Sequence, residues 1–381
     1  MSYIGYSASS SDTAIKAREI MERKMGIGRQ SALKVLEHVN THVPNDAIAT
    51  GEALEFAPRD GSGLSLSLRN QPSRDLHPHA LRQAAYKAGV PGAFITDLAS
   101  AVEPWRRDMA ADILNRHFHE SQAVERDSLP GKRFLVRAVQ NQSRAILSDR
   151  FRRLDSRPLV ETFAKGCASI GAVPVDGVVS DLRLALKAFL PIVFEPIPGE
   201  VMCLGIEWGN SDFGTAKHSL RAYILRLTCL NGATMEDSLA QVHLGGRLAD
   251  NVEFSEKTYQ LDTATQASAM GDLIQNVLGP KHVDLLLATI KSAGEKQINW
   301  KGAKSAIEKR LLKSELQLVQ DAFESQDVIN LPAGNSVWRM SNAISWIAGK
   351  TVDQDRSLEL QRLAGEVLNG KRDVSIAAEA A

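Results

Sequence analysis

Three strand-like segments in the middle of the chain constrain its fold most strongly. They are the segments Leu182–Val193, Val201–Trp208 and His218–Leu230. The last two are separated by a cluster of turn-forming residues, 209–214, which favours a β-hairpin. Strands that follow one another so closely pair most simply as antiparallel neighbours. The sequence therefore predicts an antiparallel sheet in the middle of the chain.

Helical patterns flank this sheet on both sides. Two further predicted strands, Phe134–Val139 and Arg144–Leu147, extend the sheet over residues 134–230, and a hairpin is expected within residues 51–68. Helices are predicted over residues 12–25, 29–39, 78–88, 103–119, 264–278, 280–290, 303–323, 337–348 and 353–368, with Gly26 and Gly28 separating the first two. The predicted class is α+β: an N-terminal helix and hairpin extension (1–75), a core of helices, central sheet and C-terminal helices (76–370), and a disordered tail (371–381).

Length and composition restrict the class of protein. The 381 residues include 45 basic and 45 acidic ones, so the formal charge is zero and any phosphate-binding surface must be local. No apolar run approaches the roughly 20 residues that span a bilayer, and the N-terminus lacks a secretory signal. Three scattered cysteines favour a reducing cytoplasm. No glycine-rich phosphate loop is present, and we expect neither a cofactor nor a membrane partner.

One segment, residues 131–158, is strongly basic. It has eight cations and two aspartates, a local excess of 8 − 2 = 6 positive charges: Lys132, Arg133, Arg137, Arg144, Arg150, Arg152, Arg153 and Arg157 against Asp149 and Asp155. Such a segment favours an anionic partner, most often phosphate. It also forms ion pairs when the fold brings acids to it, and the sequence leaves both alternatives open. The cations predicted to bind nucleic acid are Arg144, Arg150, Arg152 and Arg153.

The strand after the predicted hairpin turn offers a second cationic surface. Because alternate residues of a strand share a face, Lys217, Arg221 and Tyr223 are expected close together on one face. Two cations and an aromatic ring can bind backbone phosphates and stack a base. The alternative is that Tyr223 and Trp208 belong to the core. Arg226, on the other face, is expected to be paired and partly buried.

Signals for catalysis are weaker. Three pairs of histidines have suggestive spacing: His38 and His42, His77 and His79, His117 and His119. Helical geometry turns the last two pairs apart, and the first pair has no third ligand near it in sequence. Carboxylates on or near the predicted strands are candidates for holding Mg²⁺: Asp181, Glu195, Glu200, Glu207 and Asp212. Their spacing singles out no catalytic residue and no metal site.

Several segments carry a family resemblance. Arg144–Asp155 reads RAILSDRFRRLD and residues 205–214 read GIEWGNSDFG. With Ala88–Pro91, Arg226–Gly232 and Trp338–Ala343, they resemble, in the right order, a phage- and plasmid-borne family, domain-of-unknown-function family 932. The resemblance covers residues 80–368, with Phe151 where the family pattern usually has tyrosine. It implies a mobile-element setting inside a bacterial cell, and no particular activity.

Three functional hypotheses follow. The leading one is a phage- or plasmid-derived protein, not an enzyme, that binds or anneals single-stranded DNA in replication or recombination. The order of strands followed by a long helix also resembles the core of single-strand annealing recombinases, which implies self-assembly into an oligomer. The alternatives are a metal-dependent nuclease or hydrolase, and a virion-associated or host-takeover factor that binds acidic protein partners.

Overall fold

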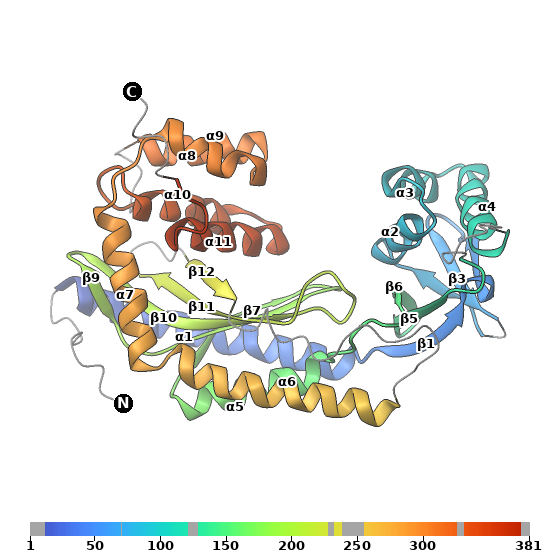
Figure 1. Cartoon of the computed structure of the whole chain (residues 1–381), viewed down its shortest axis with the longest axis horizontal. Coiled ribbons are helices and arrows are strands. Elements are labelled where there is room, and N and C mark those ends of the chain that lie inside the picture. The colour runs from blue at the N-terminus through green and yellow to red at the C-terminus, as the bar shows by residue number, and fades with distance from the viewer. Residues whose placement is uncertain are drawn as a thin grey trace.

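The computed structural model describes residues 12–69, 71–120, 129–227, 232–237, 255–325 and 331–374. They form two six-stranded sheets, each with its own helices (Figure 1). The α+β class predicted from the sequence is confirmed. The prediction of one sheet over residues 134–230 is wrong, because the strands of that region are divided between the two sheets.

The first sheet lies at one end of the molecule and recruits most of its strands from the N-terminal third of the chain (Figure 1). Its order is β1-β5-β6-β4-β3-β2, with only β4 and β6 parallel. The strands are β1 (Asn45–Thr50), β2 (Leu54–Pro58), β3 (Leu64–Leu68), β4 (Arg74–Leu76), β5 (Arg133–Val139) and β6 (Gln142–Ser148), and the 3₁₀ turn η1 (Gly51–Ala53) joins β1 to β2. The predicted boundary at residue 75 falls inside this sheet, so the structure does not separate an extension there.

Three helices cover one face of the first sheet: α2 (Pro78–Lys87), α3 (Gly92–Ser100) and α4 (Pro104–Glu120). The start of α2 is as predicted, with Pro78 in its first turn and the His77 ring accepting a hydrogen bond from the backbone N–H of His79 (3.0 Å). Helix α4 also closes the edge of the sheet. The Asn115 side chain bonds the backbone N–H (2.9 Å) and C=O (2.8 Å) of Phe56 in β2, which hinders pairing with another strand.

The second sheet has the order β12-β11-β10-β8-β7, with β9 paired to one end of β10, and every pair is antiparallel. Its strands are β7 (Val173–Val179), β8 (Leu184–Phe189), β9 (Phe194–Ile197), β10 (Glu200–Asn210), β11 (Ser219–Arg226) and β12 (Gly232–Asp237). The hairpin predicted across residues 209–214 is confirmed, since β10 and β11 pair along their length. The sequence did not predict β7, β9 or β12.

Helices pack on both faces of the second sheet; Figure 1 shows α5 and α6 below it and α10 and α11 above it. We call the first sheet with α2, α3 and α4 the first module. The helices outside it are α1 (Asp12–Thr41), α5 (Ser156–Ser169), α6 (Glu256–Val277), α7 (Pro280–Glu295), α8 (Trp300–Ile307), the 3₁₀ turn η2 (Glu308–Arg310), α9 (Lys313–Glu324), α10 (Val337–Lys350) and α11 (Gln354–Leu368). They share one large apolar core with the sheet, and Trp208 is buried in it.

Helix α1 is continuous over 30 residues, so the predicted break at Gly26 and Gly28 is wrong. Gly28 lies directly against the backbone of β7, where a Cβ atom would come within 2.3 Å of the Val175 Cα atom. The glycine therefore permits a close approach of helix and strand instead of ending the helix.

The C-terminal end differs in part from its prediction. Of the predicted disordered tail, residues 371–374 are described: Val374 is buried, and Arg372 forms an ion pair with Glu366 (2.7 Å). The rest of that prediction lies outside the described residues. Within the described ranges, no helix combines the length and the apolar character needed to cross a membrane.

Candidate functional site

The two sheets meet at a junction that contains buried arginines of the basic segment. Arg137 of β5 is 1% exposed, and its guanidinium donates to Asp46 Oδ1 (2.7 Å), Asp155 Oδ1 (2.6 Å) and the backbone oxygen of Asp212 (2.9 Å). These acceptors come from β1, the start of α5 and the hairpin between β10 and β11. Burial alone would lower the pKa of Arg137, but the two carboxylates outweigh it and raise the pKa. Arg137 thus ties the two sheets together.

Two predicted phosphate-binding arginines face α6 instead of solvent. Arg152 forms a two-pronged ion pair with Asp262 (2.5 and 2.6 Å). Arg153 lies 3.6 Å from Asp46 and stacks on the Tyr259 ring, 4.5 Å from its centroid. Both side chains connect the basic segment to other parts of the fold.

Arg144 of β6 is also buried. It donates to the backbone oxygen of Asp181 (2.8 Å), lies 3.7 Å from the carboxylate of that residue and covers the Phe213 ring. The expectation that these guanidinium groups stay open to an outside polyanion is therefore wrong for Arg144, Arg152 and Arg153. The physical reason is that their acidic partners are distant in sequence, so a local charge count does not include them.

Two of the predicted cations, Arg150 and Lys217, are exposed. They belong to adjoining loops, because Gly214 of the hairpin loop lies against the Phe151 ring and Leu147 side chain. This is the part of the predicted basic surface that reaches solvent.

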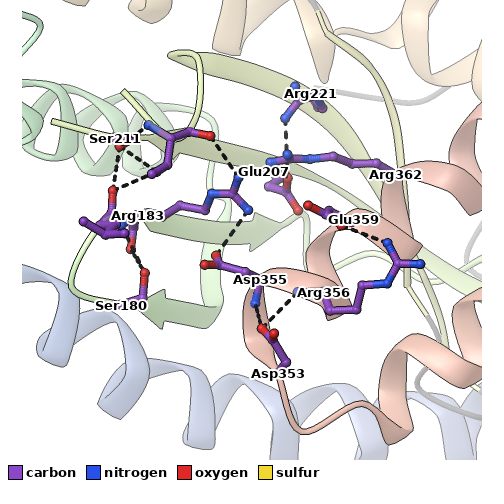
Figure 2. A network of polar contacts seen from close by, with 12 residues as sticks. Ser180, Arg183, Glu207, Ser211, Arg221, Asp353, Asp355, Arg356, Glu359 and Arg362 are labelled. Carbon is purple, nitrogen blue, oxygen red and sulfur yellow. Dashed lines mark hydrogen bonds and ion pairs between the residues drawn. The ribbon is translucent and has the colours of Figure 1, made fainter. Parts of the chain in front are cut away.

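Arg221 belongs to a charged network on the face of the second sheet that α11 covers (Figure 2). At its centre Glu207 is fully buried and lies 3.5 Å from Lys187, 3.5 Å from Arg362 and 3.8 Å from Arg221. The Thr234 hydroxyl donates to the same carboxylate (3.0 Å). Burial alone would raise the pKa of Glu207, but the three cations and this hydrogen bond hold it below its ordinary value.

The network continues to the start of α11. Arg183, which precedes β8, forms an ion pair with Asp355 (3.2 Å), and Asp353 caps the helix by accepting from two backbone N–H groups (Figure 2). Charged contacts thus fix both the position and the first turn of α11 on the sheet. This arrangement serves the fold, since its charges face one another.

Tyr223 does not line a groove wall. It is 6% exposed and lies under Lys187, whose ammonium is 4.8 Å from the ring centroid; burial raises the pKa of the phenol. Trp208 is buried as well. The prediction of Tyr223 as a base-stacking residue is wrong, and the alternative that both rings belong to the core is confirmed.

The carboxylates considered for a nuclease do not converge. Glu207 and Asp181 face cations, and Glu200 binds Arg226 (2.5 Å) and the Trp338 indole (3.0 Å). The paired, partly buried state predicted for Arg226 is confirmed. Within the part of the chain that the structure describes, no three His, Cys, Asp or Glu side chains are grouped so that they could hold a metal ion.

A cavity of about 140 Å³ lies beside the junction, lined by the end of α1, the start of α5, Leu184 of β8 and Asp212 of the β10–β11 loop. His38 and His42 stack in it (centroids 4.0 Å apart) opposite Asp212. Burial raises the pKa of Asp212 to about 6, and burial together with His42 lowers the pKa of His38 to about 4. The cavity has room for a few water molecules, and it brings together the Asp212 carboxyl with its raised pKa and the His38 imidazole with its lowered pKa.

A more exposed group of cations, not predicted from the sequence, lies in the C-terminal part of the chain. Residues 301–313, on α8, η2 and the first turn of α9, have five basic side chains and one acidic one, and all six are exposed. We call the five cations the basic surface: Lys301, Lys304, Lys309, Arg310 and Lys313. No carboxylate of the described chain forms an ion pair with any of them, although Glu308 is their neighbour in sequence. A charge count on the polar side of this amphipathic segment would have found them.

The comparisons with known proteins add nothing to this geometry. No family model matches the chain, and neither the search of curated proteins nor that of solved structures found a match. The resemblance to domain-of-unknown-function family 932 therefore stays a prediction.

Proposed function

We propose that this protein binds nucleic acid through the basic surface of α8, η2 and α9, with no catalytic step. The observation that carries the proposal is the exposure of five cations within 13 residues, without ion pairs to the described chain. Lysine and arginine in this state bind backbone phosphates and release counterions. Because the net charge of the chain is zero, the attraction must come from a local surface such as this one.

The proposal keeps the predicted ligand but moves the binding site. Arg144, Arg152, Arg153 and Arg221 are left out because they hold the fold together, and Tyr223 is left out because it is buried. Arg150 and Lys217 are exposed and form a second, smaller candidate contact. Origin in a phage or plasmid, and a part in replication or recombination, are proposals that depend on the family resemblance alone.

Binding is tested by fluorescence anisotropy with labelled single-stranded and duplex oligonucleotides between about 50 and 200 mM salt. If the five cations each neutralise a phosphate, log affinity for a single strand falls with log salt at a slope of about −3.5, from roughly 0.7 per phosphate. The double variant Lys309→Glu and Lys313→Glu is expected to weaken binding at least about tenfold and to flatten the slope.

The matched control is Lys16→Glu with Lys165→Glu, which changes the net charge equally at exposed positions on α1 and α5. It should bind like the parent protein. Absence of binding at about 50 mM salt contradicts the proposal, and so does equal weakening by the two double variants. A variant of Arg150 and Lys217 in the same assay measures the contribution of the second contact.

A further inference from the structure

The helical layer over the first sheet exposes an apolar stripe. Val102, just before α4, and Trp105 within it are 84% and 59% exposed, and Met109 follows one turn later on the same side. Tyr86 and Phe94 of the same layer are exposed too. Large apolar and aromatic side chains gathered on a helix face are typical of interaction surfaces.

The charges around this stripe are mainly acidic, with the exposed Arg116 one turn beyond Asp112. Glu103, Asp108 and Asp112 are exposed at neighbouring positions of α4 or just before it. The nearby Arg106 forms ion pairs with Asp97 of α3 (2.5 Å) and with Glu103 (3.9 Å), whereas Asp108 and Asp112 form no ion pair with a cation of the described chain. We call this the acidic face: Val102, Glu103, Trp105, Asp108, Met109 and Asp112.

The basic surface is complementary to the acidic face. It carries the opposite charge, and Leu312, 62% exposed, lies among its cations between Arg310 and Lys313. Each surface therefore offers an exposed apolar contact beside charges that are mostly of one sign. The two lie at opposite ends of the molecule, α4 in the first module and α8 and α9 in the C-terminal lobe (Figure 1), so they do not meet within one chain.

We infer that the acidic face of one copy docks on the basic surface of a second copy. Opposite charges attract across such a contact, and Trp105 and Met109 meet the apolar side chain of Leu312. The contact is head-to-tail. In a docked pair, one copy keeps its basic surface unoccupied and the other keeps its acidic face unoccupied. Further copies can therefore add, and the assembly becomes either a closed ring or an open filament. The inference shares the basic surface with the proposed function, but it depends on the acidic face, which nucleic acid does not need. It follows that nucleic acid and a second copy compete for the same lysines.

Sedimentation velocity over a range of protein concentrations tests the inference. The parent protein is expected to associate at about 50 mM salt and to dissociate at about 500 mM, because the Debye length falls to a few ångström there. Charge reversal of the acidic face, Asp108→Lys with Asp112→Lys, and charge reversal of the basic surface, Lys309→Glu with Lys313→Glu, should each give monomers.

The decisive experiment mixes these two variants in equal amounts. Every contact between unlike variants is again between opposite charges, so association should return in the mixture although each variant alone is monomeric. A monomeric parent protein at high concentration and low salt overturns the inference, as does a mixture that stays monomeric. An interface that pairs like surfaces gives a different result, because one of the two variants keeps that surface intact and would still associate alone.

The same variants separate this inference from the proposed function. The acidic-face variant is expected to bind oligonucleotides at least as tightly as the parent protein, because it removes the competing contact and leaves the basic surface intact. If no protein variant binds oligonucleotides while the mixture still associates, the proposed function fails and the self-association stands. If oligonucleotides bind and the mixture stays monomeric, the inferred self-association fails and the proposed function stands. Circular dichroism of each variant confirms that it is folded.

Discussion

At the scale of single residues, this protein balances buried charges with partners from distant segments. Glu207 is the clearest case, because its carboxylate is fully buried among cations of β8, β11 and α11. A buried ion pair adds little to stability compared with apolar residues, but removal of one partner leaves a charge without compensation. The effect of such a network on the free energy of unfolding therefore becomes large when one of its charges is removed.

We expect Glu207→Gln to lower the free energy of unfolding by about 3–5 kcal/mol, because Lys187, Arg221 and Arg362 lose the negative charge that they share. Urea denaturation measures the change. Glu55→Gln, at an exposed position of β2, is the control and should have almost no effect. A loss below about 1 kcal/mol at Glu207 would mean that solvent or another acid compensates the cations.

At the scale of elements, packing against a neighbour overrides local propensity. Gly26 and Gly28 both disfavour a helix by themselves, yet α1 runs through them without a break. The two glycines differ in surroundings: a Cβ at position 26 meets no atom within 4 Å, whereas one at position 28 meets the backbone of β7. Only Gly28 is required by the tertiary structure.

Alanine substitutions separate these two roles. Gly26→Ala is expected to raise the free energy of unfolding by about 0.5–1 kcal/mol, since alanine favours the helix and nothing obstructs its methyl group. Gly28→Ala is expected to lower it by more than this, because helix and strand must move apart. Thermal and urea unfolding of the two variants give the comparison; equal effects of the same sign would contradict the packing argument.

At the scale of the whole molecule, the junction connects two modules that each have their own sheet and core. Asp212 is part of it: one carboxylate oxygen accepts from the backbone N–H and hydroxyl of Ser156 (3.0 and 2.8 Å), and its backbone oxygen accepts from Arg137. Burial raises the pKa of Asp212 to about 6, which makes the junction sensitive to pH.

The sign of this sensitivity follows from proton linkage. Between about pH 4 and pH 6 the folded state keeps the proton on Asp212 and the unfolded state releases it, so a rise in pH lowers the free energy of unfolding. The loss reaches at most about 3 kcal/mol and is complete above the folded-state pKa. Asp212→Asn should remove this contribution, which urea unfolding at pH 4, 5, 6 and 7 measures as the difference from the parent protein. The control Asp60→Asn, at an exposed turn, should follow the parent curve; a variant at position 212 that also follows it refutes the assignment.

The elements that could be predicted are those with strong local signals. The β10–β11 hairpin is marked by its turn residues, and helices α2, α4 and α7 by a proline in the first turn. The strands β1, β4, β7, β9 and β12 were missed, because strand periodicity in short segments is weak and their stability comes from their neighbours. The division of strands between two sheets was missed for a related reason: β5 and β6 pair with strands 67 to 93 residues earlier in the chain, and pairing partners are not encoded locally.

By itself, the sequence determined the α+β class, the principal helices and hairpin, the buried pair of Arg226 and the absence of a net charge, because each depends on local patterns or on composition. Only the tertiary structure decided which cations reach solvent. Arg144, Arg152 and Arg153 are bound by carboxylates or rings that folding brings from distant segments, whereas Lys309 and Lys313 keep no such partner within the described chain. A charge is available to a ligand only when the fold leaves it uncompensated, and that depends on contacts between residues far apart in sequence.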